Sequence, residues 1–487
     1  MNAQVKLLSW PTTADEDESP NLWDGVSLAR TTGGTATGDF AVSGVEIDSR
    51  DVQPGDLFVA LKGESTDGHR FVETALANGA AAALVDRCVE GPHVKTADTF
   101  AALVALGREA RERTRARIVG VTGSVGKTGV KEAIFAALNR ASRGRAHRSV
   151  KSYNNHVGVP LSLARMPRST RFGVFEMGMN HAGEIAALTR QVRPHVAVVT
   201  AIAPAHIEML GSEEAIADAK AEIFEGLEPG GTAVIPADSP HFERLRDAAT
   251  RCGASIVAFG KADHAQVRLL DAVSAPGGGS LITVDMGDRR VCCTVGTPGE
   301  HWIANALCVL AAVRAVGADL GSAGLALAEL EGLAGRGERI EFAADGGNAL
   351  LIDESYNANP ASMRATLRQL GGETAARRVA VLGAMKELGS HGAKYHAELA
   401  QPLAEAKVDF AILVGEEMVD LARELGKSAD PALGNVTAFA HCANVEEAVD
   451  TLRNYGLAAR DAVLVKGSNS VGLSALVSAI AKQEGRA

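Results

Sequence analysis

A glycine-rich run, Gly120-Val121-Thr122-Gly123-Ser124-Val125-Gly126-Lys127-Thr128, has the residue types of a phosphate-binding loop. Glycines let backbone N–H groups close around phosphate oxygens, Lys127 can reach terminal phosphates, and Thr128 can bind Mg2+. An apolar run precedes the loop and a helical pattern follows it, which is the context such a loop requires. The common pattern has glycine where Val121 stands, so this loop is a variant. It favours ATP over a dinucleotide, and a chance Gly-Lys-Thr sequence is the alternative.

Two more side chains could act beside this loop. Glu176 follows the apolar pair Val174-Phe175, and His206 lies in the loop after the apolar run 196–200. Both positions fall at the carboxyl edge of an expected parallel sheet, where such sheets bind ligands. Hydroxyl and carboxylate oxygens suit Mg2+, and an added histidine would suggest a second ion. Taken singly, each residue is more often an ordinary strand-end or loop side chain.

Lys220 lies on the apolar face of a helical pattern that Ser212 opens, together with Ile216 and Phe224. Burying an uncompensated ammonium group is costly. The lysine must therefore reach solvent along its stem, pair with an acid, or be chemically modified. Without further information, reaching solvent is the default interpretation.

The elements that must position these residues are short apolar runs separated by helical patterns. This alternation predicts a mainly parallel sheet with helices on both faces. Residues 281–295, interrupted at 286–288, predict an antiparallel hairpin, and a helix is expected from about 302 to 316. The expected strands of the sheet are 118–121, 173–175, 196–200, 232–235 and 255–259.

A segment with three glycines, 332–337, predicts a hinge into another domain. Strands expected beyond it at 349–353, 379–382, 410–414 and 462–465 predict a second doubly wound, Rossmann-like unit. The segment to about residue 112 reads as a small α/β domain. The sequence therefore predicts an α/β fold of three domains, 1–112, 113–338 and 339–487, of which the central one carries the phosphate loop.

Polar residues in the first domain gather where expected strands end. Asp48-Ser49-Arg50 follows one strand, and Asp67-Gly68-His69 follows the next. Loops at such positions often contact ligands, so this is a candidate anion or nucleotide site. On these residues alone, ordinary turn chemistry is the favoured explanation.

Composition limits the classes of function. A chain of 487 residues exceeds one ordinary hydrophobic core, and its net charge of −10 argues against binding nucleic acid by counterion release. Residues 1–10 lack a signal peptide, and no run approaches the roughly 18 apolar residues of a membrane span. The six cysteines lack the paired spacing of a zinc site. We therefore expect a cytoplasmic, monomeric protein without a membrane span.

Several segments resemble those of the Mur ligases of bacterial cell-wall synthesis, through all three domains. This resemblance implies one domain for a UDP-sugar-peptide, one for ATP and a mobile one that closes over the site. One departure is Ala384, where relatives usually carry Asp. The segments are 47–50, 55–64, the phosphate loop, 152–160, 176–178, 219–224, 353–360 and 466–468.

The resemblance also implies roles for individual residues. Ser49 and Arg50 would contact uridine diphosphate, and Lys220 would be carbamylated to supply negative charge for a second Mg2+. Asn154, Asn155, Asn357 and Asn359 would contact substrates. Lys127, Lys220 and His206 would be the catalytic group, and Mg2+ would be held by Thr128, Glu176, His206 and carbamylated Lys220. The nucleotide contacts would be Gly123, Ser124, Gly126, Lys127, Thr128, Asn305, Arg336, Asp353 and Tyr356.

The implied reaction is ATP-dependent addition of D-alanyl-D-alanine to UDP-N-acetylmuramoyl-tripeptide through an acyl phosphate. The sequence does not name the base that deprotonates the amine. A Mur-type ligase for another amino acid and a folate polyglutamate ligase are alternatives within the enzymes. An ATP-hydrolysing switch is the alternative from a different class.

Overall fold

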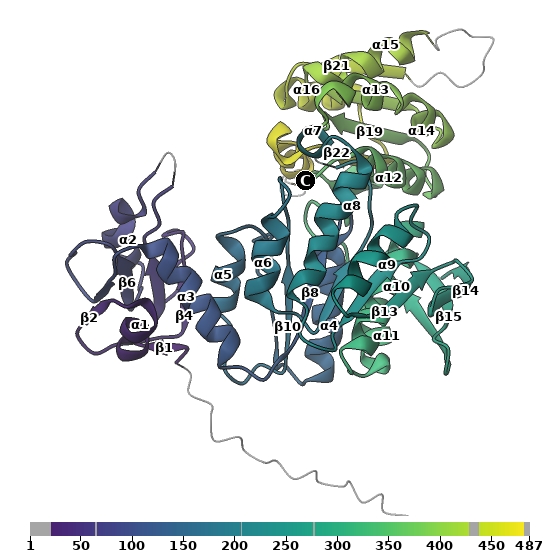
Figure 1. Ribbon diagram of the computed structural model, residues 1–487. Helices are drawn as coiled ribbons and strands as arrows, with labels where there is room; N and C mark the ends of the chain where they lie inside the picture. Colours follow the sequence, from purple (N-terminus) through teal and green to yellow (C-terminus); the bar gives the residue numbers. More distant parts are fainter. Residues whose placement is uncertain (1–20, 64–65, 206, 276–277, 428–437, 482–487) are drawn as a thin grey trace, which may run out of the picture. The chain divides into compact units, whose positions relative to one another are not determined.

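The structure is a computed structural model that describes residues 21–63, 66–205, 207–275, 278–427 and 438–481 (Figure 1). The chain forms two compact units. The first comprises residues up to 116 and 160–171, and the second comprises 117–159 and 172–487. Within the described ranges, no helix has the length and apolar character needed to cross a membrane.

The first unit contains a five-stranded sheet in the order β2-β7-β6-β5-β4, parallel except for the β2–β7 pair. Phe58 on β5 and Val72 on α2 belong to its buried core. The chain passes between the units within α5 (Gly158–Ala164). The elements of this unit are β1 (Trp23–Asp24), α1 (Gly25–Thr32), β2 (Thr35–Thr37), β3 (Ala41–Val42), β4 (Gly44–Glu46), β5 (Asp56–Val59), η1 (Gly68–Phe71), α2 (Val72–Ala77), β6 (Ala82–Val85), β7 (His93–Lys95) and α3 (Thr99–Glu112).

The second unit begins with a nine-stranded sheet in the order β16-β15-β14-β13-β12-β11-β8-β10-β9. The strands from β14 to β9 in this order run parallel, and β14, β15 and β16 form an antiparallel meander. The strands are β8 (Arg117–Thr122), β9 (Ala146–Arg148), β10 (Phe172–Glu176), β11 (Val196–Val199), β12 (Thr232–Pro236), β13 (Ser255–Gly260), β14 (Val267–Ser274), β15 (Ser280–Asp285) and β16 (Arg290–Val295).

Helices cover both faces of this sheet because its crossovers run in opposite directions from β8. Helices α4, α10 and α11 share one apolar core with Val119 and Val121 of β8. Helix α6 connects β10 to β11 and α9 connects β12 to β13, and both connections run along the sheet in the direction opposite to that from β8 to β9. The helices are α4 (Lys127–Ala141), α6 (Glu184–Val192), α7 (Ile207–Leu210), α8 (Glu213–Ala221), η2 (Glu222–Gly226), α9 (Phe242–Arg251), α10 (Glu300–Ala315) and α11 (Leu320–Ala328).

The C-terminal part, drawn green to yellow in Figure 1, has a six-stranded sheet in the order β17-β18-β22-β19-β20-β21. All strands except β17 run parallel. One face packs on α12 to α15 and the other on α16 and α17, which gives two separate cores. The strands are β17 (Glu338–Ala344), β18 (Gly347–Glu354), β19 (Arg378–Gly383), β20 (Phe410–Val414), β21 (Ala438–Cys442) and β22 (Ala462–Lys466).

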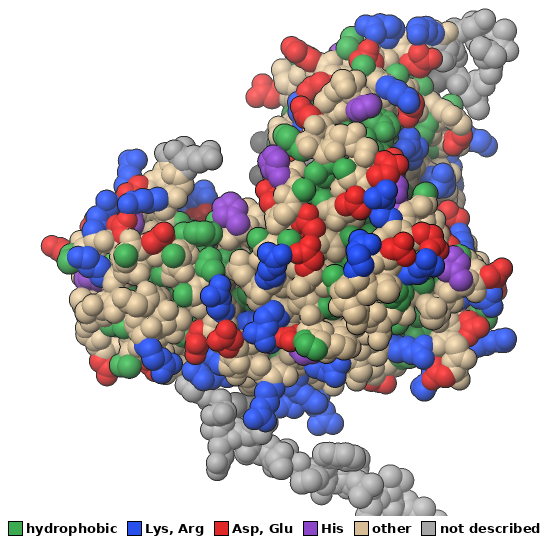
Figure 2. Space-filling view, in the orientation of Figure 1, with side chains coloured by type: hydrophobic (Ala, Val, Ile, Leu, Met, Phe, Trp, Pro, Cys, Tyr) green, Lys and Arg blue, Asp and Glu red, His purple; other side chains and the backbone are tan. Residues whose placement is uncertain are grey.

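The helices of this part are short, and on the face drawn in Figure 2 they carry interspersed acidic and basic side chains. They are α12 (Pro360–Gly372), η3 (Gly389–His391), α13 (Gly392–Ala397), α14 (Ala400–Glu405), η4 (Glu416–Met418), α15 (Val419–Lys427), α16 (Val445–Tyr455), η6 (Asn469–Val471) and α17 (Ser474–Ala481).

The structure confirms the α/β class and the strands expected in both large sheets. The sequence prediction did not include β9, β14, β17 and β21. Strand β9 has three residues, and β17 is an antiparallel edge strand with the alternating exposure that such strands adopt. The division into three functional domains stays a prediction.

Candidate functional site

The phosphate loop joins the end of β8 to the first residue of α4. Gly123 has φ +148° and Gly126 has φ +86°, values that favour glycine. A Cβ atom at Gly123 would also lie 2.0 Å from Thr200 Oγ1, so the loop has no room for a side chain there. Helix α4 starts without a side-chain cap, which leaves its first N–H groups available to an anion.

Lys127 is folded back on this loop. Its Nζ donates to Gly123 O at 2.7 Å. Burial lowers the pKa of Lys127, the charge of Glu176 opposes that shift, and the charge of Arg336 adds to it. A phosphate at the loop would supply the negative charge that favours the ammonium form.

Glu176 lies at the end of β10, next to β8, and is buried. Its Oε2 accepts a 2.9 Å hydrogen bond from Thr128 Oγ1, and its Oε1 accepts a 2.8 Å bond from Asn154 Nδ2. Hydroxyl and carboxylate oxygens are ligands that Mg2+ prefers. The Thr128 and Glu176 side chains have the chemistry to hold one Mg2+ ion, and their role as its ligands stays a prediction.

His206 lies outside the described residues. In the part of the chain that the structure describes, no three His, Cys, Asp or Glu side chains form a cluster that could hold a metal ion. Nucleotide phosphates and water would have to complete the coordination of an ion held by Thr128 and Glu176.

Lys220 is fully buried near the end of α8. Its Nζ has no hydrogen-bond partner among the described residues, so the default interpretation, a stem reaching solvent, is wrong. The pKa of Lys220 is lowered well below its usual value, first by burial and then by the charge of Lys127. The charges of Glu222, Glu176 and Glu184 oppose this lowering of the pKa, and a buried amine without a hydrogen-bond partner needs a ligand or a modification.

A cavity of about 740 Å3 connects the phosphate loop to the carboxyl edge of the six-stranded sheet. Arg336 contacts residues from both parts. Its Nη2 donates to Ser152 Oγ at 3.2 Å, and its guanidinium carbon lies 4.3 Å from the centre of the Tyr356 ring. Asn305, on α10, packs against the loop. The predicted residues that line the cavity are Ser124, Gly126, Lys127, Asn154, Glu176, Asn305, Arg336, Tyr356, Asn357 and Asn359.

Other predicted residues support the site without lining the cavity. Asp353 accepts from the backbone N–H groups of Gly335 at 2.8 Å and Ser355 at 3.0 Å. Asn155 Oδ1 accepts from the N–H of Gly158 at 2.9 Å, at the start of α5. Both side chains hold loops in place through these hydrogen bonds. The described residues predicted for the site in this unit but absent from the lining are Gly123, Thr128, Asn155, Lys220 and Asp353.

Comparisons with known proteins identify the family of this chain. The Mur ligase family, catalytic domain, matches residues 41–121, the Mur ligase middle domain matches 121–313, and the Mur ligase, glutamate ligase domain, matches 335–469. The UDP-N-acetylmuramoyl-tripeptide–D-alanyl-D-alanine ligase of Escherichia coli K12 is 33% identical over 91% of this chain and 94% of its own length. The chain belongs to the Mur ligase family.

Solved Mur ligase structures are similar across nearly the whole chain. A crystal structure of MurF from Acinetobacter baumannii is 29% identical, with a TM-score of 0.80, and the match covers 94% of this chain and 99% of that one. The MurF ligase of Thermotoga maritima in complex with ADP is 26% identical, with a TM-score of 0.70, over 91% of this chain and 98% of that one.

In this Mur ligase, Ser49 and Arg50 lie in the first unit, in the turn that follows β4. Ser49 is buried and its carbonyl accepts from Asn78 Nδ2 at 2.9 Å. The Arg50 side chain is 85% exposed and forms an ion pair with Asp48 at 2.6 Å. Arg50 is thus presented to solvent, while Ser49 helps to anchor the turn.

Glu354 and Lys466 also line the cavity, although the sequence prediction gave neither of them an individual role. Glu354 ends β18 and Lys466 ends β22, and their side chains form an ion pair of 3.1 Å. Both lay within motifs of the family, 353–360 and 466–468, but only the fold brings the two motifs together. His301, which also lines the cavity, has its pKa lowered by burial, with an opposing effect from Glu354.

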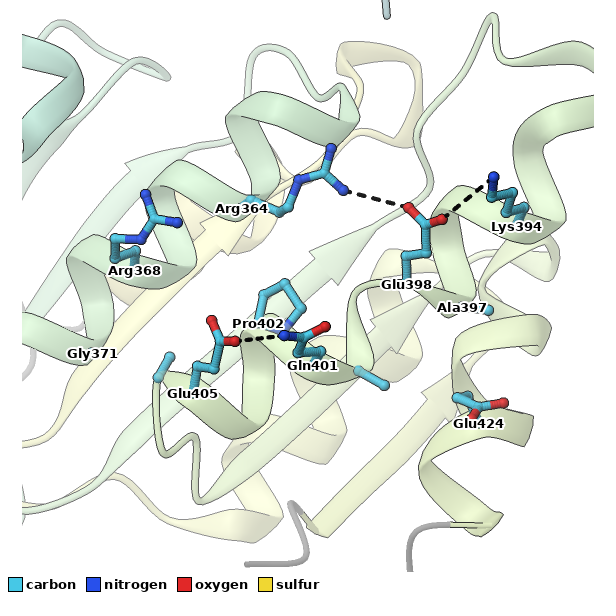
Figure 3. A pocket seen from close by; sticks show the side chains of 12 residues that line it. Arg364, Arg368, Gly371, Lys394, Ala397, Glu398, Gln401, Pro402, Glu405 and Glu424 are labelled. Carbon is cyan, nitrogen blue, oxygen red and sulfur yellow. Dashed lines mark hydrogen bonds and ion pairs between the residues drawn. The ribbon is translucent and has the colours of Figure 1, made fainter.

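A second cavity, of about 790 Å3, lies among α12 to α15 on the six-stranded sheet (Figure 3). Three of its charged side chains form ion pairs, because Glu398 pairs with Arg364 at 3.5 Å and with Lys394 at 3.8 Å. None of the predicted site residues lines it. Although slightly smaller, the cavity at the phosphate loop is the candidate active site.

Proposed function

We propose that this chain joins the amine of D-alanyl-D-alanine to the peptide carboxylate of UDP-N-acetylmuramoyl-tripeptide, with ATP converted to ADP and phosphate. The observation that carries this proposal is the shared cavity. Lys127 of the phosphate loop lines the same cavity as Asn357 and Asn359, which lie in the segment between β18 and α12. The likeness to D-alanyl-D-alanine ligases over nearly the whole chain supports the choice of substrates.

In the first step, an oxygen of the substrate carboxylate attacks the γ-phosphorus of ATP and the bond to ADP breaks. The product is an acyl phosphate, whose phosphate is a good leaving group. The loop N–H groups and the Lys127 ammonium would hold the phosphates and stabilise the charge that develops on their oxygens. The nucleotide itself would lie against Asn305, Arg336 and Tyr356.

Mg2+ would neutralise phosphate charge in this step. Thr128 and Glu176 would hold one ion, with Asn154 orienting the carboxylate of Glu176. We propose that the neutral amine of Lys220 adds to carbon dioxide and loses a proton, which gives a carbamate. That carbamate, with His206, would be a ligand for a second ion.

In the second step, the free amine of the dipeptide attacks the acyl carbon, and phosphate leaves with the former carboxylate oxygen. Asn359 Nδ2 is buried without a hydrogen-bond partner among the described residues, so it has a donor available to the dipeptide. Enclosure of the cavity by the C-terminal domain would protect the acyl phosphate from water.

The remaining parts of the proposal concern the whole protein. Residues 1–112, with Ser49 and Arg50, would bind the UDP-sugar-peptide, 113–338 would bind ATP, and 339–487 would bind the dipeptide. We propose that the protein acts in the cytoplasm as a monomer, since this one chain supplies every predicted site residue.

Isotope transfer tests the acyl phosphate. The carboxylate of UDP-N-acetylmuramoyl-tripeptide is labelled with a heavy oxygen isotope, and the released phosphate is analysed by mass. We expect one labelled oxygen in each phosphate, because the carboxylate oxygen leaves with it. Unlabelled phosphate together with amide product would rule out this intermediate.

A further inference from the structure

Lys466 and Glu354 face each other at the carboxyl edge of the six-stranded sheet. They are register partners on the adjacent parallel strands β22 and β18, so their pairing is fixed by the sheet. The Lys466 side chain is 2% exposed and the Glu354 side chain 14%. Both line the candidate active-site cavity. Burying a pair of charges costs free energy, and packing of the sheet does not require charges at this edge. The pair therefore needs another explanation.

The lysine also holds the backbone of the neighbouring loop. Lys466 Nζ lies 2.9 Å from Asn357 O, in addition to its 3.1 Å contact with Glu354 Oε2. The loop is fixed at its start by Asp353, which accepts from Ser355 N–H. At its end Asn359 caps α12 by accepting from Ser362 N–H. Lys466 thus holds Asn357 in the middle of the segment 354–359, while Tyr356 N–H donates separately to Gly335 O at 3.1 Å.

The ion pair with Glu354 decides whether Lys466 binds substrate directly or positions the neighbouring loop. A free cation could bind a substrate carboxylate directly, whereas Lys466 already has a carboxylate and a carbonyl as partners. The geometry points to a positioning residue: we propose that Lys466, held by Glu354, fixes residues 357–359 for recognition of the amine substrate. This inference rests on the proposed function, because it takes the amine to be a dipeptide bound by that segment.

The first experiment compares Lys466→Met with the wild-type protein in ligation assays that vary one substrate at a time. We expect KM for D-alanyl-D-alanine to rise roughly tenfold or more, because a charge-assisted hydrogen bond is lost. KM for ATP should stay within about twofold, because Tyr356, the nucleotide contact next to Asn357, is held separately by Gly335 O and the Arg336 guanidinium. Glu354→Gln, which removes the charge but keeps an acceptor, should raise the dipeptide KM by a smaller factor.

Asp461→Asn is the matched control. Asp461 precedes the first residue of β22, is 1% exposed and pairs with Arg377 at 2.5 Å. Its replacement also weakens a buried ion pair of the same sheet, but at the opposite end of the strand. It should lower the unfolding temperature and leave the dipeptide KM unchanged.

The wild-type assay tests the proposed function separately from the positioning role of Lys466. Ligation of the dipeptide by the wild-type protein, with an unchanged dipeptide KM in Lys466→Met, would overturn the positioning role and leave the proposed function intact. Equal rises in the KM values for D-alanyl-D-alanine, ATP and UDP-N-acetylmuramoyl-tripeptide would also overturn the positioning role. If Lys466→Met does not fold, Glu354→Gln is judged by the same criterion. Failure of the wild-type protein to use the dipeptide would overturn both.

Discussion

Thr128 Oγ1 donates a 2.9 Å hydrogen bond to Glu176 Oε2, and this contact ties the first turn of α4 to the end of β10. The two oxygens come from positions 48 residues apart in the chain. They meet because β8 and β10 are neighbours in the sheet, with Glu176 in register with Val121. The pair gives the phosphate loop an acidic partner at the place where Mg2+ would bind.

Glu176→Gln should raise the Mg2+ concentration needed for half-maximal ligation by roughly tenfold or more, because an anionic ligand becomes neutral. A magnesium titration of phosphate release measures this. Glu225→Gln, which removes an exposed carboxylate paired with Arg190 at 2.8 Å, is the control and should not change the titration. An unchanged magnesium requirement in Glu176→Gln would refute the assignment.

Lys127→Ala should reduce kcat by about a thousandfold, because the lysine would stabilise charge on the transferred phosphoryl group. Single-turnover formation of ADP measures the loss. The unfolding temperature of the variant should stay close to that of the wild type, since Lys127 Nζ contacts only a loop carbonyl in the described residues. Full activity would contradict the role of the loop.

Lys220→Ala should lose most activity and regain part of it in small carboxylates such as acetate or propionate, which replace the carbamate. Lys131→Ala is a matched control, because Lys131 is equally buried but donates to Ser149 O at 3.0 Å and Lys151 O at 2.9 Å. Whatever activity that variant keeps, carboxylates should not increase it. Rescue of both variants, or of neither, would remove the case for the carbamate.

Acid should destabilise the C-terminal part through His396. Burial lowers the pKa of this ring below 6.5, and its Nε2 accepts from Met385 N–H at 2.9 Å. The unfolded chain therefore binds the proton more readily, so the stabilisation is complete above about pH 6.5 and is lost as pH falls toward the folded-state pKa. A protonated ring could not accept that hydrogen bond.

Urea unfolding between about pH 7.5 and 5.5 tests this effect, and the free energy of unfolding should fall further in the wild type than in His396→Gln over that range. His391→Gln replaces an exposed histidine of the same region and should keep the wild-type slope. Equal slopes for the wild type and His396→Gln would show that His396 does not govern the acid response.

The predictable parts of the site are those encoded locally. The phosphate loop could be recognised because Gly123, Gly126 and Lys127 act within one short segment. The ion pair between Glu354 and Lys466 joins residues 112 apart and depends on the register of β18 with β22, which no local pattern specifies. Likewise, the helical pattern placed Lys220 on the apolar face, but only packing from other elements shows that its amine cannot reach solvent.

The most direct test of the central claim is phosphate release from ATP and Mg2+ with UDP-N-acetylmuramoyl-tripeptide, with and without D-alanyl-D-alanine, while the product is followed by mass. The account predicts release that requires both substrates, and a product heavier than the acceptor by one dipeptide less one water. Release without the dipeptide, or a product formed only with another amine, would contradict it.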